Sequence, residues 1–371
     1  MTARAVLRSG IIGTGFMGQV HTRAVRSNGG IMVAYAGRDL VRTRNAADEE
    51  NVPLALTPDE LIERPDIDLV HICTPNAHHL PLALAAISAG KHVICEKPLA
   101  LTLDDAVRLA DAARDAGVVA AVPFIYRFYP TVREVRARLA ETSERIWLAH
   151  GHYLQDWLSD QSSYNWRVAD GDSRAFADIG VHWCDLFEFM SGHRIQRLIA
   201  LQPRLHDTRY TEHGEVPVST EDGVTMLFQT DKGATGSVAI SQATPGRKNR
   251  LWLSLDGAQH SYAFDQENPN DLWTGSTVGV SVLLKGQETL NHEAAKSYVT
   301  VPSGHPQGYQ DCFSLFMRDV TRTIEGQQVP GLPTFSDGVR AAALTEAVIA
   351  SARSGGWVDV APTRHLELIR S

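Results

Sequence analysis

The sequence predicts an α/β protein in two parts. Residues 1–124 are expected to form a doubly wound parallel sheet, and residues 125–371 an α+β domain with a large, mostly antiparallel open sheet. Three observations predict this division. Continuous apolar runs alternate with helical segments before Pro123, and strand-length runs after it alternate between apolar and polar residues. The chain also has 371 residues, more than one domain usually contains.

In the first part, the apolar runs are rich in Val, Ile and Ala, which is typical of strands buried on both faces of a parallel sheet. These runs are Ala5–Ile12, Ile31–Ala36, Leu69–Thr74, His92–Cys95 and Val118–Val122. The segments between them carry helix signals. Thr57 to Glu60 has the pattern of a capping box with proline at the first helical position. Gly90 and Gly117 stand where helices are expected to end.

The second part is predicted to hold fewer helices and several alternating strands. We expect helices over Thr131–Leu139, Ile179–Met190 and Asp337–Arg353. The alternating apolar positions are Val224/Met226/Phe228, Val238/Ile240, Leu251/Leu253/Leu255 and Tyr262/Phe264. Alternation indicates an antiparallel sheet with one buried face.

Composition excludes several classes of protein. The charged residues, 35 basic and 43 acidic, give a net charge of −8, which disfavours a nucleic-acid partner. The longest apolar stretches are too short to cross a membrane, and no signal peptide is evident near Ile11. The four cysteines lack CxxC spacing, and the histidines lack the pattern of a metal site, so we expect free thiols, no metal and a cytoplasmic location.

A glycine-rich motif follows the first predicted strand and opens a helix. Its glycines are Gly13, Gly15 and Gly18, with Phe16 and Met17 between the last two. In a Rossmann domain these glycines make the tight turn, let the backbone approach a pyrophosphate, and allow close packing of helix on strand. The alternative is a glycine-rich turn that binds nothing.

The end of the second predicted strand bears on cofactor choice. An acidic residue there binds the ribose of NAD, whereas an arginine accommodates the 2′-phosphate of NADP. Here Gly37 occupies the acidic position and Arg38 follows it, so we expect NADP(H) to be favoured over NAD(H). Arg38 as an ordinary surface residue is the alternative. Asp39 is either a substitute acid or the N-cap of the next helix.

The motifs TPN-x-x-H and AGKHVxCEKPLA within His71–Ala100 resemble the Gfo/Idh/MocA family of sugar oxidoreductases, as does the D-x-G-x-H pattern of Asp178–His182. The resemblance implies that the loop of Thr74, Pro75, Asn76 and His79 lies beside the bound dinucleotide. It implies the same for Glu96 and Lys97 of the Glu-Lys-Pro motif, whose Lys–Pro bond is often cis. It also implies cofactor contacts for Trp166 and Arg167.

The resemblance further implies that His182 is catalytic and that Asp178 holds the substrate, and the chemistry of these residues agrees. Oxidation of an alcohol needs a base, and the pKa of histidine lies nearest neutrality. The Lys97 ammonium would stabilise negative charge on the reacting oxygen. The alternatives are a surface lysine, a helix N-cap at Asp178 and a packed core histidine. Should His182 not be the base, His152 or Tyr153 is next.

Three further residues are candidates for binding the substrate. The segment from Tyr153 to Trp157, continuing through Tyr164 to Trp166, combines aromatic and polar groups, which suits either a carbohydrate platform or an aromatic-rich interface or core edge. Arg127 matches a common position of the family just after the first domain.

Together these features predict an NAD(P)-dependent oxidoreductase that transfers a hydride between a cofactor and a sugar, polyol or sugar derivative. A non-catalytic dinucleotide-binding sugar sensor, an NAD-dependent glycosidase and a biosynthetic reductase are the alternatives. Because both faces of the second sheet carry apolar residues, Trp252 among them, we expect a homodimer or homotetramer.

Overall fold

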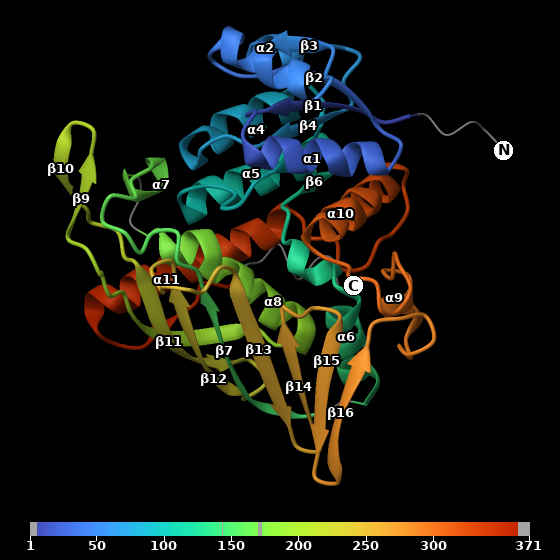
Figure 1. Ribbon diagram of the computed structural model, residues 1–371, viewed down its shortest axis with the longest axis vertical. Coiled ribbons are helices and arrows are strands. Elements are labelled where there is room, and N and C mark those ends of the chain that lie inside the picture. The colour runs from blue at the N-terminus through green and yellow to red at the C-terminus, as the bar shows by residue number, and fades with distance from the viewer. Residues whose placement is uncertain (1–5, 143, 170–172, 363–371) are drawn as a thin grey trace. The chain divides into compact units, whose positions relative to one another are not determined.

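The computed structural model describes residues 6–142, 144–169 and 173–362 (Figure 1). Its contacts divide the chain into two compact units. Of the described residues, the first unit holds 6–125 and 309–342, and the second holds 126–308 and 343–362. The sequence analysis placed everything after residue 124 in one domain, whereas these contacts group Tyr309–Ala342 with the first unit.

The first unit contains the predicted parallel sheet. Its strand order is β3-β2-β1-β4-β5-β6, and all neighbours are parallel. The strands are β1 (Arg8–Ile12), β2 (Ile31–Ala36), β3 (Leu54–Leu56), β4 (Leu69–Ile72), β5 (His92–Cys95) and β6 (Ala120–Ala121). The order reverses between β1 and β4, so the carboxyl ends of these two strands mark the place where doubly wound sheets bind ligands.

Helices join these strands and cover the sheet (Figure 1). They are α1 (Phe16–Ser27), α2 (Leu40–Glu49), α3 (Pro58–Glu63), α4 (His79–Ser88), α5 (Leu103–Ala116) and α10 (Tyr309–Ile324). Thr57 and Glu60 form the predicted capping box of α3, and Gly117 ends α5 with φ of 66°. Helix α10 packs beside α1, where the Ser27 hydroxyl donates to Ser314 over 2.9 Å.

The second unit is built on one mixed sheet of nine strands in the order β16-β15-β14-β13-β7-β12-β11-β8-β17. All neighbours are antiparallel except β7 and β12. The strands are β7 (Ile146–Leu154), β8 (Ile195–Leu201), β11 (Gly223–Thr230), β12 (Thr235–Ser241), β13 (Arg250–Gly257), β14 (His260–Asp265), β15 (Asp271–Ser276), β16 (Gly279–Leu284) and β17 (Val358–Asp359). A separate hairpin pairs β9 (Thr208–Thr211) with β10 (Gly214–Pro217).

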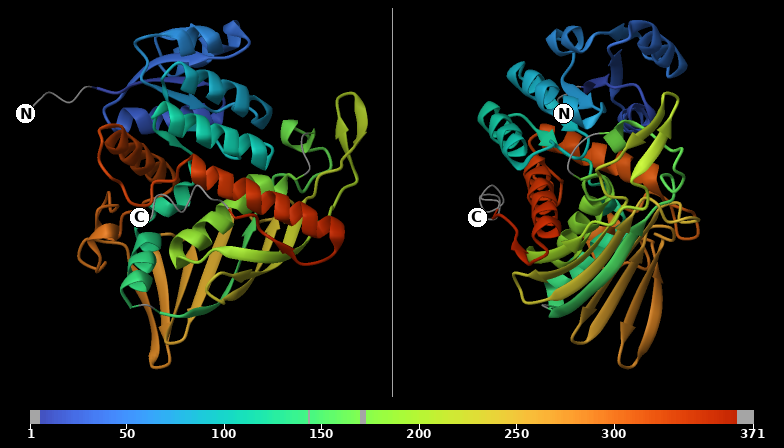
Figure 2. Two further views of the ribbon diagram at one scale, coloured as in Figure 1. Left: turned by 180° about the vertical axis from the view of Figure 1, so that it is seen from behind. Right: turned by 90° about the vertical axis from the view of Figure 1, so that its left-hand side faces the viewer.

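Helices of the second unit cover one face of this sheet (Figure 2). The longer ones are α6 (Pro130–Thr142), α8 (Val181–Ser191) and α11 (Phe335–Ser354), and the boundary between the units falls within α11. The shorter ones are α7 (Trp166–Ala169) and α9 (Glu293–Lys296). The predicted alternation is confirmed, because Val224, Met226 and Phe228 are buried while the residues between them are exposed.

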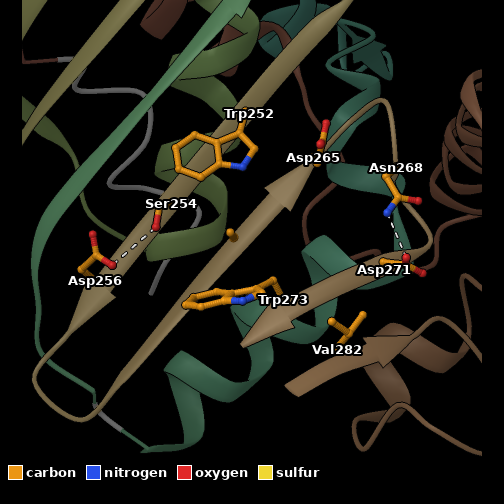
Figure 3. Close-up of a pocket in the computed structure, with 9 residues that line it drawn as sticks. Trp252, Ser254, Asp256, Asp265, Asn268, Asp271, Trp273 and Val282 are labelled. Atoms are coloured by element: carbon orange, nitrogen blue, oxygen red, sulfur yellow. Dashed lines mark hydrogen bonds between the residues drawn. The ribbon is translucent and has the colours of Figure 1, made fainter. Parts of the chain in front are cut away.

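The other face of the nine-stranded sheet carries a hollow of about 460 Å³ (Figure 3). Its lining comes from β13 to β16 and includes Trp252 and Trp273, with Asp256 and Asp265 at its edge. We call this side the open face. The sheet therefore has one face packed on helices and one face that presents aromatic and acidic side chains.

Three further properties hold within the described part of the chain. No helix there is long and apolar enough to cross a membrane. No group of three or more His, Cys, Asp or Glu side chains among the described residues has the arrangement of a metal site. All four cysteines are free thiols, as expected.

Candidate active site

The glycine motif between β1 and α1 has the geometry that a dinucleotide requires. Gly13 adopts φ of 102°, and a Cβ there would lie 2.5 Å from the Cys73 carbonyl oxygen. A Cβ on Gly18 would lie 2.5 Å from the Gly13 carbonyl oxygen, whereas Gly15 faces open space. The backbone at Gly15 is thus accessible, and the first turn of α1 presents its free N–H groups there. These features fit a pyrophosphate.

The residues beside these glycines also lie where the motif predicts. Phe16 begins α1 and is 67% exposed. The Tyr309 hydroxyl of α10 donates to the Met17 sulfur over 3.8 Å, so that α10 supports the loop from one side. The sequence did not indicate this contact, because Tyr309 lies 292 residues away.

At the end of β2, Gly37 is tightly enclosed and Arg38 is exposed. A Cβ on Gly37 would lie 2.5 Å from the Thr43 hydroxyl oxygen. The Asp39 carboxylate accepts a hydrogen bond from the Arg42 amide over 3.0 Å and is the N-cap of α2. The interpretation of Asp39 as a helix cap is confirmed. Of the candidate cofactor residues here, Arg38 extends freely from the strand end.

The loops after β4 and β5 are joined by His79. The His79 Nδ1 atom lies 2.8 Å from the Pro98 carbonyl oxygen, and Nε2 lies 3.0 Å from that of Thr74. The ring is fully buried, and burial lowers its pKa. His79 thus holds the two loops together. Thr74, Pro75 and Asn76 lie on the first loop, and the Thr74 amide lies close to Gly13.

Glu96 and Lys97 follow β5 directly. The Lys97 amide donates to the Glu96 carboxylate over 3.2 Å, and the Lys97–Pro98 peptide is cis, as the resemblance implied. Glu96 is 7% exposed, whereas Lys97 is half-buried. The first unit therefore brings together the glycine loop, the loop of Thr74 and the Glu-Lys-Pro motif at one edge of its sheet.

In the second unit, Asp178 and His182 lie on consecutive turns of one helical stretch. The turn Phe176–Gly180 is π-helical and continues into α8 at Val181. Asp178 lies inside this turn, so the alternative interpretation as a helix N-cap is wrong. Such π-helical turns often occur at functional sites. Gly180 allows the turn, because a Cβ there would lie 2.5 Å from the Phe176 ring.

Gln242 and Arg167 both contact the Asp178 carboxylate. The Gln242 side-chain amide at the end of β12 donates to Asp178 over 2.7 Å, and the Arg167 guanidinium lies 3.8 Å from the same oxygen. Gln242 is fully buried. Arg167 also lies over the Trp157 ring, with 5.8 Å between its guanidinium carbon and the ring centroid. The carboxylate is thus held between a neutral donor and a cation.

His182 is 8% exposed and lies against two tyrosines. Its ring centroid is 5.2 Å from that of Tyr126 in an edge contact and 6.5 Å from that of Tyr153. The Tyr126 and Tyr153 hydroxyls are 2.7 Å apart, and Tyr153 donates to the Asn249 side-chain oxygen over 2.8 Å. Because Tyr153 gives its proton to Asn249, Tyr126 is the donor between the two hydroxyls.

The same network reaches Trp157. The Gln155 amide also donates to Asn249 over 2.8 Å, and the Trp157 indole donates to Gln155 over 2.7 Å. Trp157 is 36% exposed, whereas Tyr153 is buried. The second unit therefore links Trp157, Tyr153 and His182 through neighbouring side chains. His152 stacks on Trp252 of the open face, on the opposite side of β7 from Tyr153.

Arg127 and Trp166 are the two remaining candidates for contacts with the substrate or the cofactor. Arg127 is 6% exposed, and its Nε atom donates to the Asp185 carboxylate of α8 over 2.8 Å, while a second guanidinium nitrogen pairs with the same carboxylate. Its charge is therefore engaged within the protein. The side chain of Trp166 lies outside the described part of the structure, so its predicted contact with the cofactor stays a prediction.

The sequence analysis missed the anchor of the π-helical turn. The Glu221 carboxylate accepts hydrogen bonds from the Arg174 and Phe176 amides over 3.0 Å and from the Ser173 hydroxyl over 2.7 Å. Burial raises the pKa of Glu221. No local pattern reveals this residue, because Glu221 precedes β11 and contacts a segment more than 40 residues earlier.

Known proteins match the chain over nearly its full length. It is 30% identical to levoglucosan dehydrogenase of Pseudarthrobacter phenanthrenivorans, covering 95% of this chain and 98% of that protein. It is 34% identical to 1,5-anhydro-D-fructose reductase of Ensifer adhaerens, covering 91% and 93%. A solved levoglucosan dehydrogenase in complex with NADH and L-sorbose superimposes with a TM-score of 0.90 at 28% identity, covering 96% and 99%.

Family models agree with these relatives in both parts of the chain. Residues 7–124 match the model of an oxidoreductase family with an NAD-binding Rossmann fold, and residues 132–262 match the GFO/IDH/MocA C-terminal domain. The glycine loop, the Glu-Lys-Pro motif and the Asp178–His182 turn lie in these matched regions. The chain belongs to the GFO/IDH/MocA family of oxidoreductases.

Proposed function

We propose that this protein is an NAD(P)-dependent dehydrogenase or reductase that interconverts a secondary alcohol and a ketone on a sugar, polyol or sugar derivative. One observation carries the proposal: His182 packs against two tyrosine rings one turn after Asp178, in a chain whose first unit has the dinucleotide loop. The names of the relatives, which act on levoglucosan and 1,5-anhydro-D-fructose, support a cyclic substrate with several hydroxyls.

Each residue has a distinct part in this chemistry. A bound nicotinamide supplies the acceptor or donor of the hydride. His182 accepts the hydroxyl proton during oxidation, and we assign the transfer to Nε2 because Nδ1 is buried. Lys97 stabilises negative charge on the substrate oxygen through its ammonium group. Asp178, oriented by Gln242, accepts hydrogen bonds from neighbouring substrate hydroxyls.

The structure supports different parts for the remaining candidates. Trp157 offers an apolar ring face next to polar side chains, which suits a sugar. Tyr153 supports the His182 ring within the tyrosine network. We infer that Arg127 acts by anchoring α8 through Asp185, because its guanidinium is buried in that ion pair.

We also propose that NADP(H) is favoured over NAD(H). Support comes from the end of β2, where Gly37 offers no carboxylate, Asp39 is engaged as a helix cap, and Arg38 is exposed. The solved relatives with NADH or NAD⁺ show that members of this family also accept the unphosphorylated cofactor.

The proposed assembly is a homodimer or homotetramer formed through the open face. This face carries exposed apolar side chains on both halves of the sheet, among them Leu201, Leu227, Trp273 and Val282. It also carries Asp256, whose carboxylate lies 3.4 Å from the His150 ring in the same chain, and His152, which stacks on Trp252. A cytoplasmic location remains part of the proposal.

A screen of sugars and polyols with both cofactors tests the proposed activity. We expect reduction of NADP⁺, and more weakly of NAD⁺, with at least one cyclic polyol, and the reverse reaction with its ketone. Tight dinucleotide binding without turnover on any compound would instead indicate a sensor. Product formed from a glycoside with only catalytic amounts of NAD⁺ would indicate a glycosidase.

A further inference from the structure

A buried chain of hydrogen bonds lies behind the Glu-Lys-Pro motif in the first unit. His21 of α1 stands between His71 of β4 and Glu96 after β5. The two Nδ1 atoms are 3.0 Å apart, and the His21 Nε2 atom is 3.0 Å from the Glu96 carboxylate. The three side chains are 2%, 1% and 7% exposed. The activity proposed above assigns no part to either histidine.

The geometry restricts where the protons lie in the hydrogen-bonded series of His71, His21 and Glu96. An ionised Glu96 only accepts, so the His21 Nε2 atom carries a proton. Neutral His21 then accepts at Nδ1, which makes the His71 Nδ1 atom the donor and leaves its Nε2 atom without a proton. The His71 Nε2 atom has no hydrogen-bond partner among the described residues. A bare nitrogen suits that apolar position better than an unpaired N–H group.

The opposite arrangement is less favourable. If Glu96 were protonated and donated to His21, both bonds would reverse, and the His71 Nε2 atom would carry a buried proton without an acceptor. Burial also lowers the pKa of His71, which agrees with a neutral ring. The first arrangement thus satisfies both hydrogen bonds of His21 with Glu96 ionised.

This chain of hydrogen bonds connects the helix after the glycine loop with the Glu-Lys-Pro motif. His21 lies on α1, the helix that begins at the glycine loop, and Glu96 accepts the Lys97 amide through its second oxygen. An ionised carboxylate held at one oxygen by His21 cannot rotate away from the Lys97 amide without breaking a charge-assisted bond. The position of the lysine backbone therefore depends on the two histidines.

We propose that His21 and His71 are positioning residues that hold Glu96 ionised and fixed in direction, and through it present Lys97 to the substrate. The part assigned to Lys97 rests on the proposed function, but the arrangement of protons does not. His71 should be present as the Nδ1–H tautomer and His21 as the Nε2–H tautomer in the protein without ligands.

Nuclear magnetic resonance of the full chain labelled with ¹⁵N-histidine tests the arrangement directly. The signals are assigned with His21→Gln and His71→Asn, and the Lys97 amide is followed in protein labelled with ¹⁵N-lysine. We expect one imidazole of each tautomer and a Lys97 amide protected from exchange. A His71 ring with its proton on Nε2, or a rapidly exchanging Lys97 amide, would overturn the proposal, whether or not a substrate is known.

Two substitutions of His71 separate positioning from packing. Asparagine places a donor where Nδ1 stands, so His71→Asn should keep the Lys97 amide signal and retain kcat within about threefold. Valine fits a strand but cannot donate, so His71→Val should shift that signal and lower kcat about ten- to hundredfold, the range for leaving a buried acceptor, here the His21 Nδ1 atom, unsatisfied. The KM for the sugar should change little, because Asp178 is untouched.

A matched control uses another buried histidine. His193 is 5% exposed in the second unit and contacts the Thr230 hydroxyl over 3.0 Å. His193→Val should lower stability without moving the Lys97 amide signal or kcat. Equal kcat values for folded His71→Asn and His71→Val would overturn the positioning role, and that result is distinct from an enzyme that turns over no sugar at all.

Discussion

Two tyrosine rings pack against the His182 imidazole, and we propose that His182 alone accepts the substrate proton. His182→Ala should lower kcat about 10²- to 10⁴-fold, because a general base is lost. Dinucleotide affinity should stay nearly unchanged, since the glycine loop and the loops after β4 and β5 all belong to the first unit. Turnover, dinucleotide titration by fluorescence and thermal unfolding measure the three effects.

Lys97→Ala should differ from His182→Ala in its effect on dinucleotide binding. Lys97→Ala should cost at least as much kcat as His182→Ala, since it removes a charge where negative charge develops. It should also weaken dinucleotide binding, because Lys97 follows β5 of the first unit. A folded His182→Ala variant with nearly full activity would move the base to another group, and Tyr153 is the next candidate by its place beside the ring.

Gln242 controls the direction of the Asp178 carboxylate. Gln242→Leu removes the donor 2.7 Å from Asp178 and keeps most of the side-chain volume, so the KM for the sugar should rise about tenfold or more. The kcat should fall less, because His182 keeps its tyrosine neighbours. Gln161→Leu is the control, since the Gln161 side-chain amide donates to Thr208 and not to Asp178. If the KM were unchanged in Gln242→Leu, Gln242 would have no part in orienting Asp178 toward the substrate.

Sequence motifs could predict features of the candidate site that depend on local structure, but not the contacts that form across the fold. Gly13, Gly18 and Asp39 were predictable because a turn, a close approach and a helix cap are set by nearby residues. Gln242 contacts Asp178 across 64 residues, and His21 contacts Glu96 across 75. Nothing near either residue marks it, because the contact exists only once the sheets have formed.

We propose that the corner between β2 and α2 decides cofactor preference. Arg38 pairs with a 2′-phosphate in our proposal, a contact of about 1.5–3 kcal/mol, so wild type should bind NADP(H) about ten- to a hundredfold more tightly than NAD(H). Arg38→Ala with Gly37→Asp should reverse the preference once the new Asp side chain has room. Because a Cβ on Gly37 would lie 2.5 Å from the Thr43 hydroxyl, the swap should need Thr43→Ala as well.

Dinucleotide titrations of four proteins check this corner: wild type, Arg38→Ala, the double variant and the triple variant. Of the four proteins, the triple variant should bind NAD(H) most tightly. Arg38→Ala alone should lower NADP(H) affinity and leave NAD(H) affinity unchanged. Wild-type protein that prefers NAD(H) would contradict the role of Arg38 and place the ribose contact elsewhere.

Elements with a strong local pattern were predicted, and weaker ones were not. The strand Ile31–Ala36 and the capping box at Thr57 match the structure, because burial on both faces and capping leave clear sequence signals. The short strand β3 has three half-buried residues and no periodic pattern. The π-helical turn before α8 depends on Glu221, which lies far along the chain.

For the whole molecule, buried histidines predict how stability depends on pH. Burial lowers the pKa of His71, His92, His152 and His193 below the usual 6.5. The unfolded chain therefore binds protons that the folded chain does not, and stability should fall as pH falls below about 6.5. The slope is at most ~1.4 kcal/mol per pH unit for each such proton. The raised pKa values of Glu221 and His292 act in the opposite direction.

Urea unfolding at pH 7.5 and 5.5 measures this difference. His92 provides a direct test, because its Nδ1 atom accepts the Val119 amide over 3.0 Å and must stay unprotonated to do so. His92→Asn keeps an acceptor that does not titrate, so the loss of stability between the two pH values should shrink. His213→Asn, at an exposed position, should leave the loss unchanged. Equal stability of wild type at both pH values would contradict the argument.

The open face predicts how copies of the chain assemble. A stable interface buries about 1,200–2,000 Å² in total, and this face offers apolar side chains across the breadth of the nine-stranded sheet. A closed dimer or tetramer would remove these side chains from water. Val282→Asp places a charge beside Trp273, at a position 58% exposed in one chain, so the subunit fold should persist while assembly weakens at least tenfold.

Light scattering at micromolar concentration should give the mass of two or four chains for wild type, and a mass near one chain for Val282→Asp at the same concentration. Val41→Asp is the matched control, because Val41 is 73% exposed on α2 of the first unit and should leave the mass unchanged. A monomeric wild type would contradict the assembly. The aromatic and acidic groups of the open face would then be exposed to solvent. A monomeric enzyme that turns over substrate would also show that activity does not require a second copy.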